Sequence, residues 1–243
     1  MQMKNPSRLH ITTLYDNVPF HPDLATDWGL SFLIQGLESP ILFDTGAKGD
    51  MLLENMHKLD IDPESITRIV LSHEHKDHIG GLNPLSDKIP GAEVWMPHFF
   101  PEKLKDALKE QGLKVVDVEG FSPICPGAYT TGIVPGWIRE QSLVLESMQG
   151  LVVLTGCSHP RIINILEKVK QLFTDKIHMV LGGFHLGGFE KAEIKEILHA
   201  FRTAGVEKVG PAHCTGTEAR QYFQEEFGDG YLEIGVGREI DIP

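Results

Sequence analysis

Cysteine is scarce in this sequence. Only Cys125, Cys157 and Cys214 occur among 243 residues, and an odd, sparse set is not the disulfide framework that holds small secreted domains together. We therefore expect reduced thiols and a cytoplasmic location. The first residues, MQMKNPSRLHITTLYDN, also lack the charged and then apolar layout of a signal peptide, which favours the same location.

Positive charge and long apolar runs are scarce as well. The 22 Lys and Arg residues are outnumbered by 34 Asp and Glu, which gives a formal net charge of −12. Nucleic acids and anionic membranes need a basic surface, so neither is expected as a partner. Because no uninterrupted apolar run approaches the length of a membrane span, we predict a soluble protein that acts on a small molecule.

Several catalytic motifs are missing too. The sequence has no Gly-x-Ser-x-Gly elbow for a serine nucleophile, no P-loop and no dinucleotide fingerprint. Any catalysis must therefore depend on other side chains.

Polar side chains recur where predicted strands end. A hydrophobic content of 41% is enough for the core of one large α/β domain over residues 1–243. Strand-like and helix-like segments alternate along the chain, and in layered α/β folds ligands gather at the strand ends. The residues that follow predicted strands are Asp44, the segment 73–78, His159, His185 and His213.

The second half of the chain repeats one strand–helix phrase. GLVVLTG, KIHMVLGG and VEKVGPAH are predicted strands, and each is followed by an amphipathic helix. The last segment, YLEIGVGREIDI, is predicted to form a closing pair of strands. Trp28, in WGLSFLI, is expected to lie in the core.

The segment HEHKDH places three histidines and an aspartate within residues 73–78. A buried polar group without a partner is penalised, so this cluster needs solvent, mutual hydrogen bonds or a metal ion. In an extended loop alternate residues point the same way, so His73 and His75 can hold one ion. Asp77 and His78 then turn away and can serve a second. Imidazole and carboxylate suit zinc, manganese or iron, and the spacing favours a metal site.

His-x-His-x-Asp-His after a buried strand resembles the metallo-β-lactamase superfamily. The similarity extends to FDTG, TGCSHP and PAHCTG, and so covers most of the chain. It implies an α/β fold of the four-layer αββα sandwich type, with metals at the strand ends between two mixed sheets. By motif, it implies a first metal site of His73, His75 and His159, and a second of Asp77, His78 and His213.

Three further residues are expected beside the ligands. The resemblance makes Asp44, in FDTG, a residue that orients the ligand loop; a turn-forming aspartate before a glycine is the alternative. Cys157 and Cys214 flank His159 and His213. Each could be an additional ligand or a site of oxidation, but we favour small buried residues that fit tightly beside the metal.

One position departs from the family pattern. The superfamily usually has an aspartate that bridges two metals, on a strand end between the motifs of His159 and His213. Here that segment reads VLGGFHLGG and has no carboxylate. His185 stands at or near this place, and its flanking glycines favour a site role over a core histidine. We therefore expect one or two divalent ions, zinc first, with manganese or iron as alternatives.

TGCSHP, GGFHL and HCTG together resemble one branch of the superfamily. It is typified by the synthase that joins a dihydropterin to ribofuranosylaminobenzene phosphate, and it includes proteins called metal-dependent hydrolases. Our first hypothesis is hydrolysis of a small ester, lactone or phosphoester by metal-bound hydroxide. Asp77 would accept a proton, and His185 would donate to the leaving group or stabilise negative charge.

Two other functions remain open. The branch resemblance suggests a transferase that moves a dihydropterinylmethyl group and releases pyrophosphate. A non-catalytic small-molecule sensor is the third hypothesis. In each case the partner is a small molecule that could carry a phosphate, and self-association into a homo-oligomer is common for such enzymes.

Overall fold

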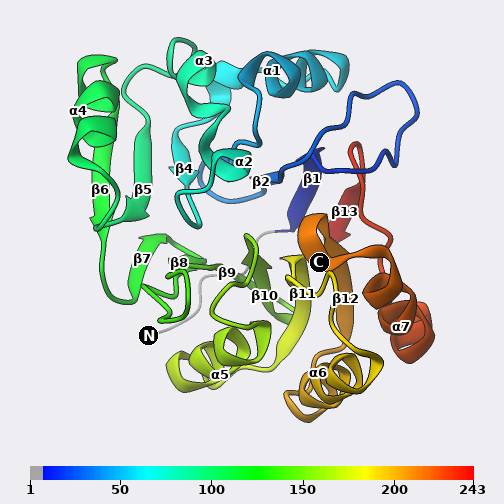
Figure 1. The fold of residues 1–243 in the computed structure, drawn as a ribbon. Coiled ribbons are helices and arrows are strands. Elements are labelled where there is room, and N and C mark those ends of the chain that lie inside the picture. The colour runs from blue at the N-terminus through cyan, green and yellow to red at the C-terminus, as the bar shows by residue number, and fades with distance from the viewer. Residues whose placement is uncertain (1–7) are drawn as a thin grey trace.

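Two mixed β-sheets lie face to face in this computed structural model, which describes residues 8–243 (Figure 1). The strands of the first sheet are β1 (Leu9–Tyr15), β2 (Ser31–Gln35), β3 (Ile41–Phe43), β4 (Arg68–Val70), β5 (Glu93–Pro97), β6 (Lys114–Val118) and β13 (Glu239–Ile242). Their order is β13-β1-β2-β3-β4-β5-β6. The run from β3 to β6 is parallel, and the pairs formed by β1 with β13, β1 with β2 and β2 with β3 are antiparallel.

The second sheet is built in the same way. Its strands are β7 (Ser122–Cys125), β8 (Ala128–Thr130), β9 (Leu143–Ser147), β10 (Gly150–Thr155), β11 (Ile177–Gly183) and β12 (Lys208–Ala212). Their order is β12-β11-β10-β9-β8-β7, and only the pairs β10–β11 and β11–β12 are parallel. The sheet is therefore mixed, as the family resemblance predicted.

Helices cover the two outer faces (Figure 1). The helices that pack on the first sheet are α1 (Gly49–Lys58), α3 (Leu82–Ser86) and α4 (Glu102–Glu110). Those on the second sheet are α5 (Ile162–Leu172), α6 (Lys191–Thr203) and α7 (Thr217–Phe227). The predicted four-layer αββα sandwich is confirmed.

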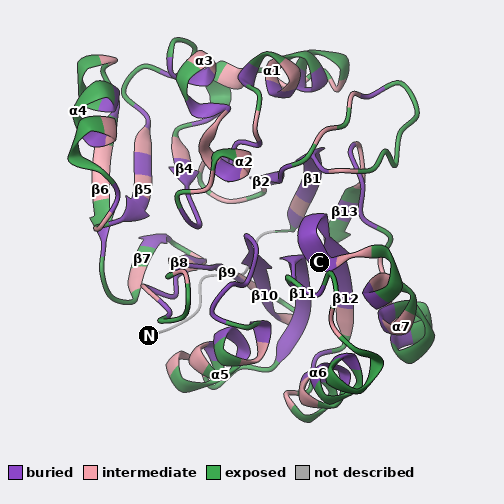
Figure 2. Ribbon diagram, viewed as in Figure 1, coloured by how far each residue is buried: buried purple, intermediate pink, exposed green. Residues whose placement is uncertain are grey.

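Both faces of the central strands are buried. In β10, Val152 and Leu154 pack between the sheets, whereas Leu151 and Val153 pack against the helices. This alternation follows from the two-residue period of a strand, and it explains why these strands are hydrophobic throughout. Figure 2 shows the result: the strands are largely buried, and the exposed residues gather on the outer sides of the helices.

The closing segment differs from its prediction. Only β13 forms a strand there, and Tyr231 and Val236 form isolated bridges to Val209 and Pro19. A side chain at Gly235 would lie 2.8 Å from the backbone nitrogen of Phe20. Because the segment pairs first with β12 and then with the loop at residues 18–20, its backbone hydrogen bonds are divided between two partners and no first strand forms. Among residues 8–243, no helix is both long enough and apolar enough to cross a membrane.

Candidate metal centre

The segment 73–78 leaves the end of β4 and turns into a short helix, α2 (Lys76–Ile79). The backbone is still extended at His75, which precedes the helix with φ −66° and ψ 143°. The predicted extended loop is therefore correct as far as His75, and the helix was missed. The turn at Lys76 separates His73 and His75 from Asp77 and His78. In Figure 1, α2 lies near the centre of the view, between the two helical layers.

Three histidines converge beside α2. His73, His75 and His159 form what we call the three-histidine group, with one ligand-type atom from each lying within 4.8 Å of the others. Their ring centroids are nearly equidistant: 4.7 Å for His73–His75, and 4.8 Å for both His73–His159 and His75–His159. His159 comes from the loop after β10 in the other sheet. The site therefore bridges the two sheets, as predicted.

A second cluster, the four-residue group, consists of Asp77, His78, Cys157 and His213. Asp77 Oδ2 lies 3.1 Å from His213 Nε2 and 3.6 Å from His78 Nε2. The three predicted residues of the second site are thus brought together. Cys157, expected to pack beside the ligands, instead lies within the cluster, and its Sγ is 3.2 Å from His78 Nε2.

Asp44 supports both clusters. Its Oδ2 accepts a hydrogen bond from His78 Nδ1 at 2.7 Å, and its two oxygens accept from the backbone and hydroxyl of Ser72. Because the Ser72 hydroxyl donates its hydrogen to Asp44, its oxygen accepts the hydrogen bond from His73 Nδ1, which lies 2.9 Å away. Asp44 is therefore bonded to His78 directly and to His73 through Ser72, and such contacts fix the orientation of an imidazole ring.

Glu140 is a supporting residue that sequence reasoning missed. Its carboxylate is fully buried and accepts hydrogen bonds from the backbone nitrogens of Ser158 and His159 and from His159 Nδ1. It also lies 3.7 Å from His73 Nδ1. The sequence around it, IREQSL, has no metal-site spacing. Glu140 is paired with Val134 through an isolated bridge, and the next residue, Gln141, is bonded to Ser72 beside His73.

Burial favours neutral imidazoles at His73 and His78, whereas at His213 burial is outweighed by the hydrogen bond to Asp77, which raises the pKa of this histidine. Burial lowers the pKa of His73 well below its ordinary value, and burial together with the neighbouring His213 lowers the pKa of His78 to about 3. Burial alone would raise the pKa of Glu140, but His73 and His159 lower it to about 2. Neutral imidazole is the form that binds metals. An ionised Glu140 that accepts a hydrogen bond from His159 Nδ1 makes this histidine a stronger ligand.

The residues fit a metal. The Nδ1 atoms of His73, His78, His159 and His213 all contact protein oxygens, and the oxygen for His213 is Asn17 Oδ1 at 3.0 Å. This arrangement leaves the Nε2 atoms to face inward. The Nε2 atom of His73 is buried and has no hydrogen-bond partner among the described residues, whereas that of His213 lies 3.1 Å from Asp77 Oδ2. An ion would satisfy the Nε2 atom of His73, which offsets the cost of burying it.

His185 lies at the rim of the three-histidine group. It follows β11, its side chain is exposed, and its ring centroid is 4.5 Å from that of His159. Exposure excludes the core-histidine alternative. His185 also forms a third set of ligand-type atoms with Cys157 and Cys214. Contact with the Cys214 thiol raises the pKa of His185, although burial opposes this.

The strand end before His185 carries no side chain. A Cβ at Gly183 would lie 2.7 Å from Cys214 Sγ and 2.4 Å from the carbonyl oxygen of Gly156. Such contacts are too short for any larger residue. The space into which a side chain at the end of β11 would project is therefore filled by the two thiol-bearing loops.

Backbone strain concentrates at the same place. Six non-glycine residues in the described part of the chain have a positive φ, and five of them lie at or next to the clusters. These five are Asp44 (57°), Ser158 (65°), Arg161 (74°), His185 (51°) and His213 (46°). Strained conformations of this kind persist where the surrounding structure holds functional side chains in place.

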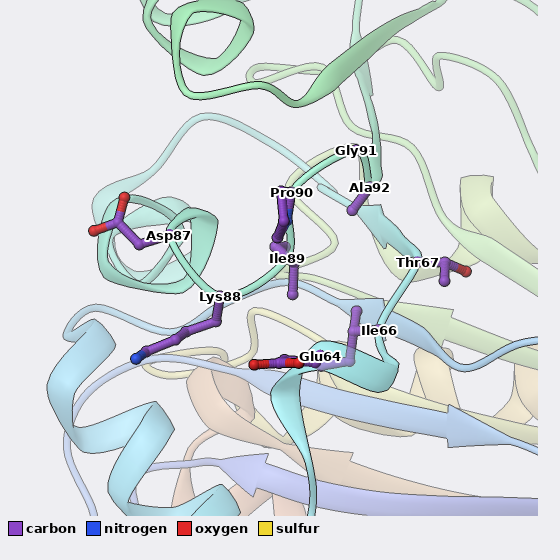
Figure 3. Close-up of a pocket in the computed structure, with 9 residues that line it drawn as sticks. All are labelled: Glu64, Ile66, Thr67, Asp87, Lys88, Ile89, Pro90, Gly91 and Ala92. Atoms are coloured by element: carbon purple, nitrogen blue, oxygen red, sulfur yellow. The ribbon is translucent and has the colours of Figure 1, made fainter.

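A cavity of about 180 Å³ opens beside the three-histidine group. Its wall includes His159 and His185 together with polar and apolar residues, namely Ser158, Arg161, Ile162, Ile163, Phe184, Leu186, Phe189, Glu193, Glu196 and Ile197. A larger cavity of about 360 Å³, shown in Figure 3, lies elsewhere. It is lined by Thr67 and Ala92, just before β4 and β5. It is thus at the opposite strand ends from the histidines.

Two tryptophans flank the clusters. Trp28 is 56% exposed and its ring lies 4.8 Å from that of His213, so its predicted place in the core is wrong. Trp137 is 83% exposed and lies 5.9 Å from the ring of His159. The loop containing Trp28 lies over the end of the sheet instead of inside it, because β2 begins only at Ser31.

Comparisons with known proteins show the family and the fold. The chain is 28% identical to the 7,8-dihydropterin-6-methyl-4-(beta-D-ribofuranosyl)-aminobenzene-5'-phosphate synthase of Methanocaldococcus jannaschii, over 94% of this chain and 95% of that one. A solved metal-dependent hydrolase of the beta-lactamase superfamily is 30% identical, with a TM-score of 0.80 over 96% of this chain and 98% of that one. The metallo-beta-lactamase fold protein YhfI from Bacillus subtilis has a TM-score of 0.70 over 97% of this chain and 99% of that one. At 14% identity, this likeness shows the fold alone. The family model of the metallo-beta-lactamase superfamily matches residues 29–165, and this chain belongs to that superfamily.

Proposed function

We propose that this enzyme of the metallo-β-lactamase fold hydrolyses a small ester, lactone or phosphoester with the help of a bound divalent metal. The proposal rests on the three-histidine group, because three protein ligands leave a coordination position for a substrate or a water. His159 belongs both to this group and to the wall of the 180 Å³ cavity. A substrate in the cavity would therefore lie next to the metal ligands.

The bound ion would lower the pKa of a water and polarise a carbonyl or phosphoryl oxygen. The residues of the chain supply the rest. Asp77, which is 18% exposed at its side chain, can accept a proton from an attacking water. His185 lines the cavity and can donate a proton to the leaving group. Arg161 lines the same cavity and can hold an anionic part of the substrate.

Replacement of His73 by alanine tests the proposal. We expect His73→Ala to lose hydrolysis of a panel of p-nitrophenyl esters, lactones and bis(p-nitrophenyl) phosphate, because the first metal would lose a ligand. His178→Ala is the control: His178 is also buried, but it contacts Glu207 on the outer part of the second sheet. Circular dichroism would check the fold. Unchanged turnover in His73→Ala would contradict the proposal.

A second candidate is the transfer of a dihydropterinylmethyl group to a ribofuranosylaminobenzene phosphate, with release of pyrophosphate. Two observations favour it. The similar protein from Methanocaldococcus jannaschii is named as such a synthase, and the exposed rings of Trp28 and Trp137 are suited to stack on flat aromatic substrates. Incubation with both substrates should then yield the coupled product and pyrophosphate. Absence of both would remove this candidate.

A further inference from the structure

The thiol of Cys157 lies among the predicted ligands of the second metal. Its Sγ is 3.2 Å from His78 Nε2, and one ligand-type atom from each member of the four-residue group lies within 4.8 Å of the others. Cys157 is buried, with an exposed fraction of 3%. The same Nε2 atom is left for a metal, because His78 Nδ1 is bonded to Asp44.

The spacing of these atoms suits a single tetrahedral ion. Ligand atoms about 2.0–2.3 Å from such an ion lie roughly 3.3–3.6 Å from one another. Three separations in the group are close to this spacing: 3.2 Å for His78–Cys157, 3.1 Å for Asp77–His213 and 3.6 Å for Asp77–His78. The remaining pairs of ligand atoms lie within 4.8 Å, so an ion would draw them closer together.

Cys157 is better placed for this role than Cys214. The Cys214 thiol groups with Cys157 and His185, not with Asp77 and His78. Its Sγ contacts the carbonyl oxygen of Cys157 at 3.6 Å. Gly183 adds no side chain between the two loops, because a Cβ there would meet Cys214 Sγ at 2.7 Å. The Cys157 thiol is hydrogen-bonded to Cys214 and also contacts His78 Nε2 at 3.2 Å, so of the two thiols it is the one that lies among the predicted ligands of the second site.

We propose that Cys157 is the fourth ligand of a closed Asp-His-His-Cys site formed by Asp77, His78, His213 and Cys157. The inference rests on the proposed metal-binding function and assigns different roles to the two clusters. Four protein ligands complete a tetrahedral site, whereas three leave a position open. The three-histidine group is then the place where substrate binds. The thiolate makes the closed site selective for zinc over manganese, because manganese prefers oxygen ligands.

Cobalt substitution tests the sulfur ligand directly. Full-length protein, stripped of metal and loaded with two equivalents of Co²⁺, should show a thiolate-to-cobalt charge-transfer band in the near ultraviolet. The band should be lost in Cys157→Ser and kept in Cys125→Ser, since Cys125 is a buried thiol on β7. It should also be kept in Cys214→Ser. A band retained in Cys157→Ser, or lost in Cys214→Ser, overturns the proposal.

Zinc binding gives a second, quantitative readout. Titration of metal-free protein should show that Cys157→Ser weakens one of two sites by more than the roughly 10- to 100-fold that loss of a supporting residue costs. The other site should be unchanged. Equal binding at both sites in Cys157→Ser and the parent protein contradicts the assignment.

Zinc K-edge X-ray absorption on the unmodified protein covers the case in which Cys157→Ser fails to fold. We expect a sulfur scatterer at about 2.3 Å, and a fit with nitrogen and oxygen alone overturns the sulfur ligand. That outcome would leave hydrolysis untouched, because hydrolysis is tested separately through His73. If the parent protein shows the sulfur signal but does not hydrolyse any substrate of the panel, only the proposed function is contradicted.

Discussion

The three-histidine group and the four-residue group differ in chemistry and in support. The first contains only imidazoles and borders a cavity, whereas the second adds a carboxylate and a thiol. Glu140 is bonded to His159 in the first, and Asn17 is bonded to His213 in the second. Asp44 alone reaches both, through His78 and through Ser72.

Residues from one short motif lie in both clusters. Because residues 73–78 contribute side chains to each, the motif by itself does not distinguish the two clusters. The supporting residues come from distant segments, and they do distinguish the two clusters. Because a supporting carboxylate fixes the ring orientation and raises the basicity of its histidine, its replacement should weaken one cluster selectively. Substitutions at these residues can therefore separate the two clusters experimentally.

Asp44→Asn should have the largest effect, because Asp44 supports both clusters. The amide cannot accept all the hydrogen bonds that the carboxylate receives, so we expect metal affinity to fall about 10- to 100-fold at each. The free energy of unfolding of the metal-free protein should fall by about 1–3 kcal/mol. Elemental mass spectrometry after dialysis measures the loss of metal, and urea unfolding measures the loss of stability.

Asp60→Asn is the control for Asp44→Asn: Asp60 also has a positive φ (55°) but lies exposed after α1. Loss of metal from one cluster only would show that the support is not shared.

Glu140→Gln should weaken the three-histidine group alone. The carboxylate that accepts from His159 Nδ1 would be lost, and affinity for the first metal should fall about 10- to 100-fold. The cobalt spectrum of the four-residue group should stay the same, which sharpens the contrast with Asp44→Asn. Glu146→Gln, on β9 and bonded to Tyr129, is the matched control. Equal loss at both clusters would argue against separate support.

Asn17→Ala should weaken the four-residue group by a smaller factor. Asn17 is bonded to both the Nδ1 atom and the backbone oxygen of His213, but it is a neutral residue. We expect roughly a 10-fold loss of affinity for the second metal, at the low end of the range for supporting residues. Competition with a chromophoric chelator would measure it. A change confined to the first metal would refute the assignment of Asn17 to this group.

Trp137→Ala should have the smallest effect and leave both metals in place. Trp137 is exposed and near His159, so it can contact substrate without supporting a ligand. An aromatic contact contributes about 0.5–1.5 kcal/mol, so KM for an aromatic substrate should rise roughly 2- to 10-fold with little change in kcat. Phe121→Ala is the control, because Phe121 is also exposed but stacks on Tyr129. A loss of metal in Trp137→Ala would show a supporting role instead.

The clustering of the proposed ligands was predictable because each of these residues follows a strand within a dense local motif. His73, His75 and His78 share one segment, and His159 and His213 stand beside cysteines at strand ends. The short helix α2 was not predictable, since four residues carry too little periodicity to be recognised. The prediction for the closing segment was wrong because that segment pairs with two distant partners, Val209 and Pro19, through single bridges, and no local pattern indicates such partners.

The sequence by itself determined the alternation of strands and helices, the predicted ligand residues and the absence of a carboxylate from VLGGFHLGG. These features are local, because hydrophobic periodicity and ligand spacing are properties of short segments. The sandwich of two sheets was expected from the family resemblance of the motifs. Only the tertiary structure decided that Glu140 and Asn17 support the ligands, that Cys157 lies among them, and that Trp28 is exposed. Such contacts join residues far apart in the chain, so they exist only after the two sheets have packed and brought their strand ends together.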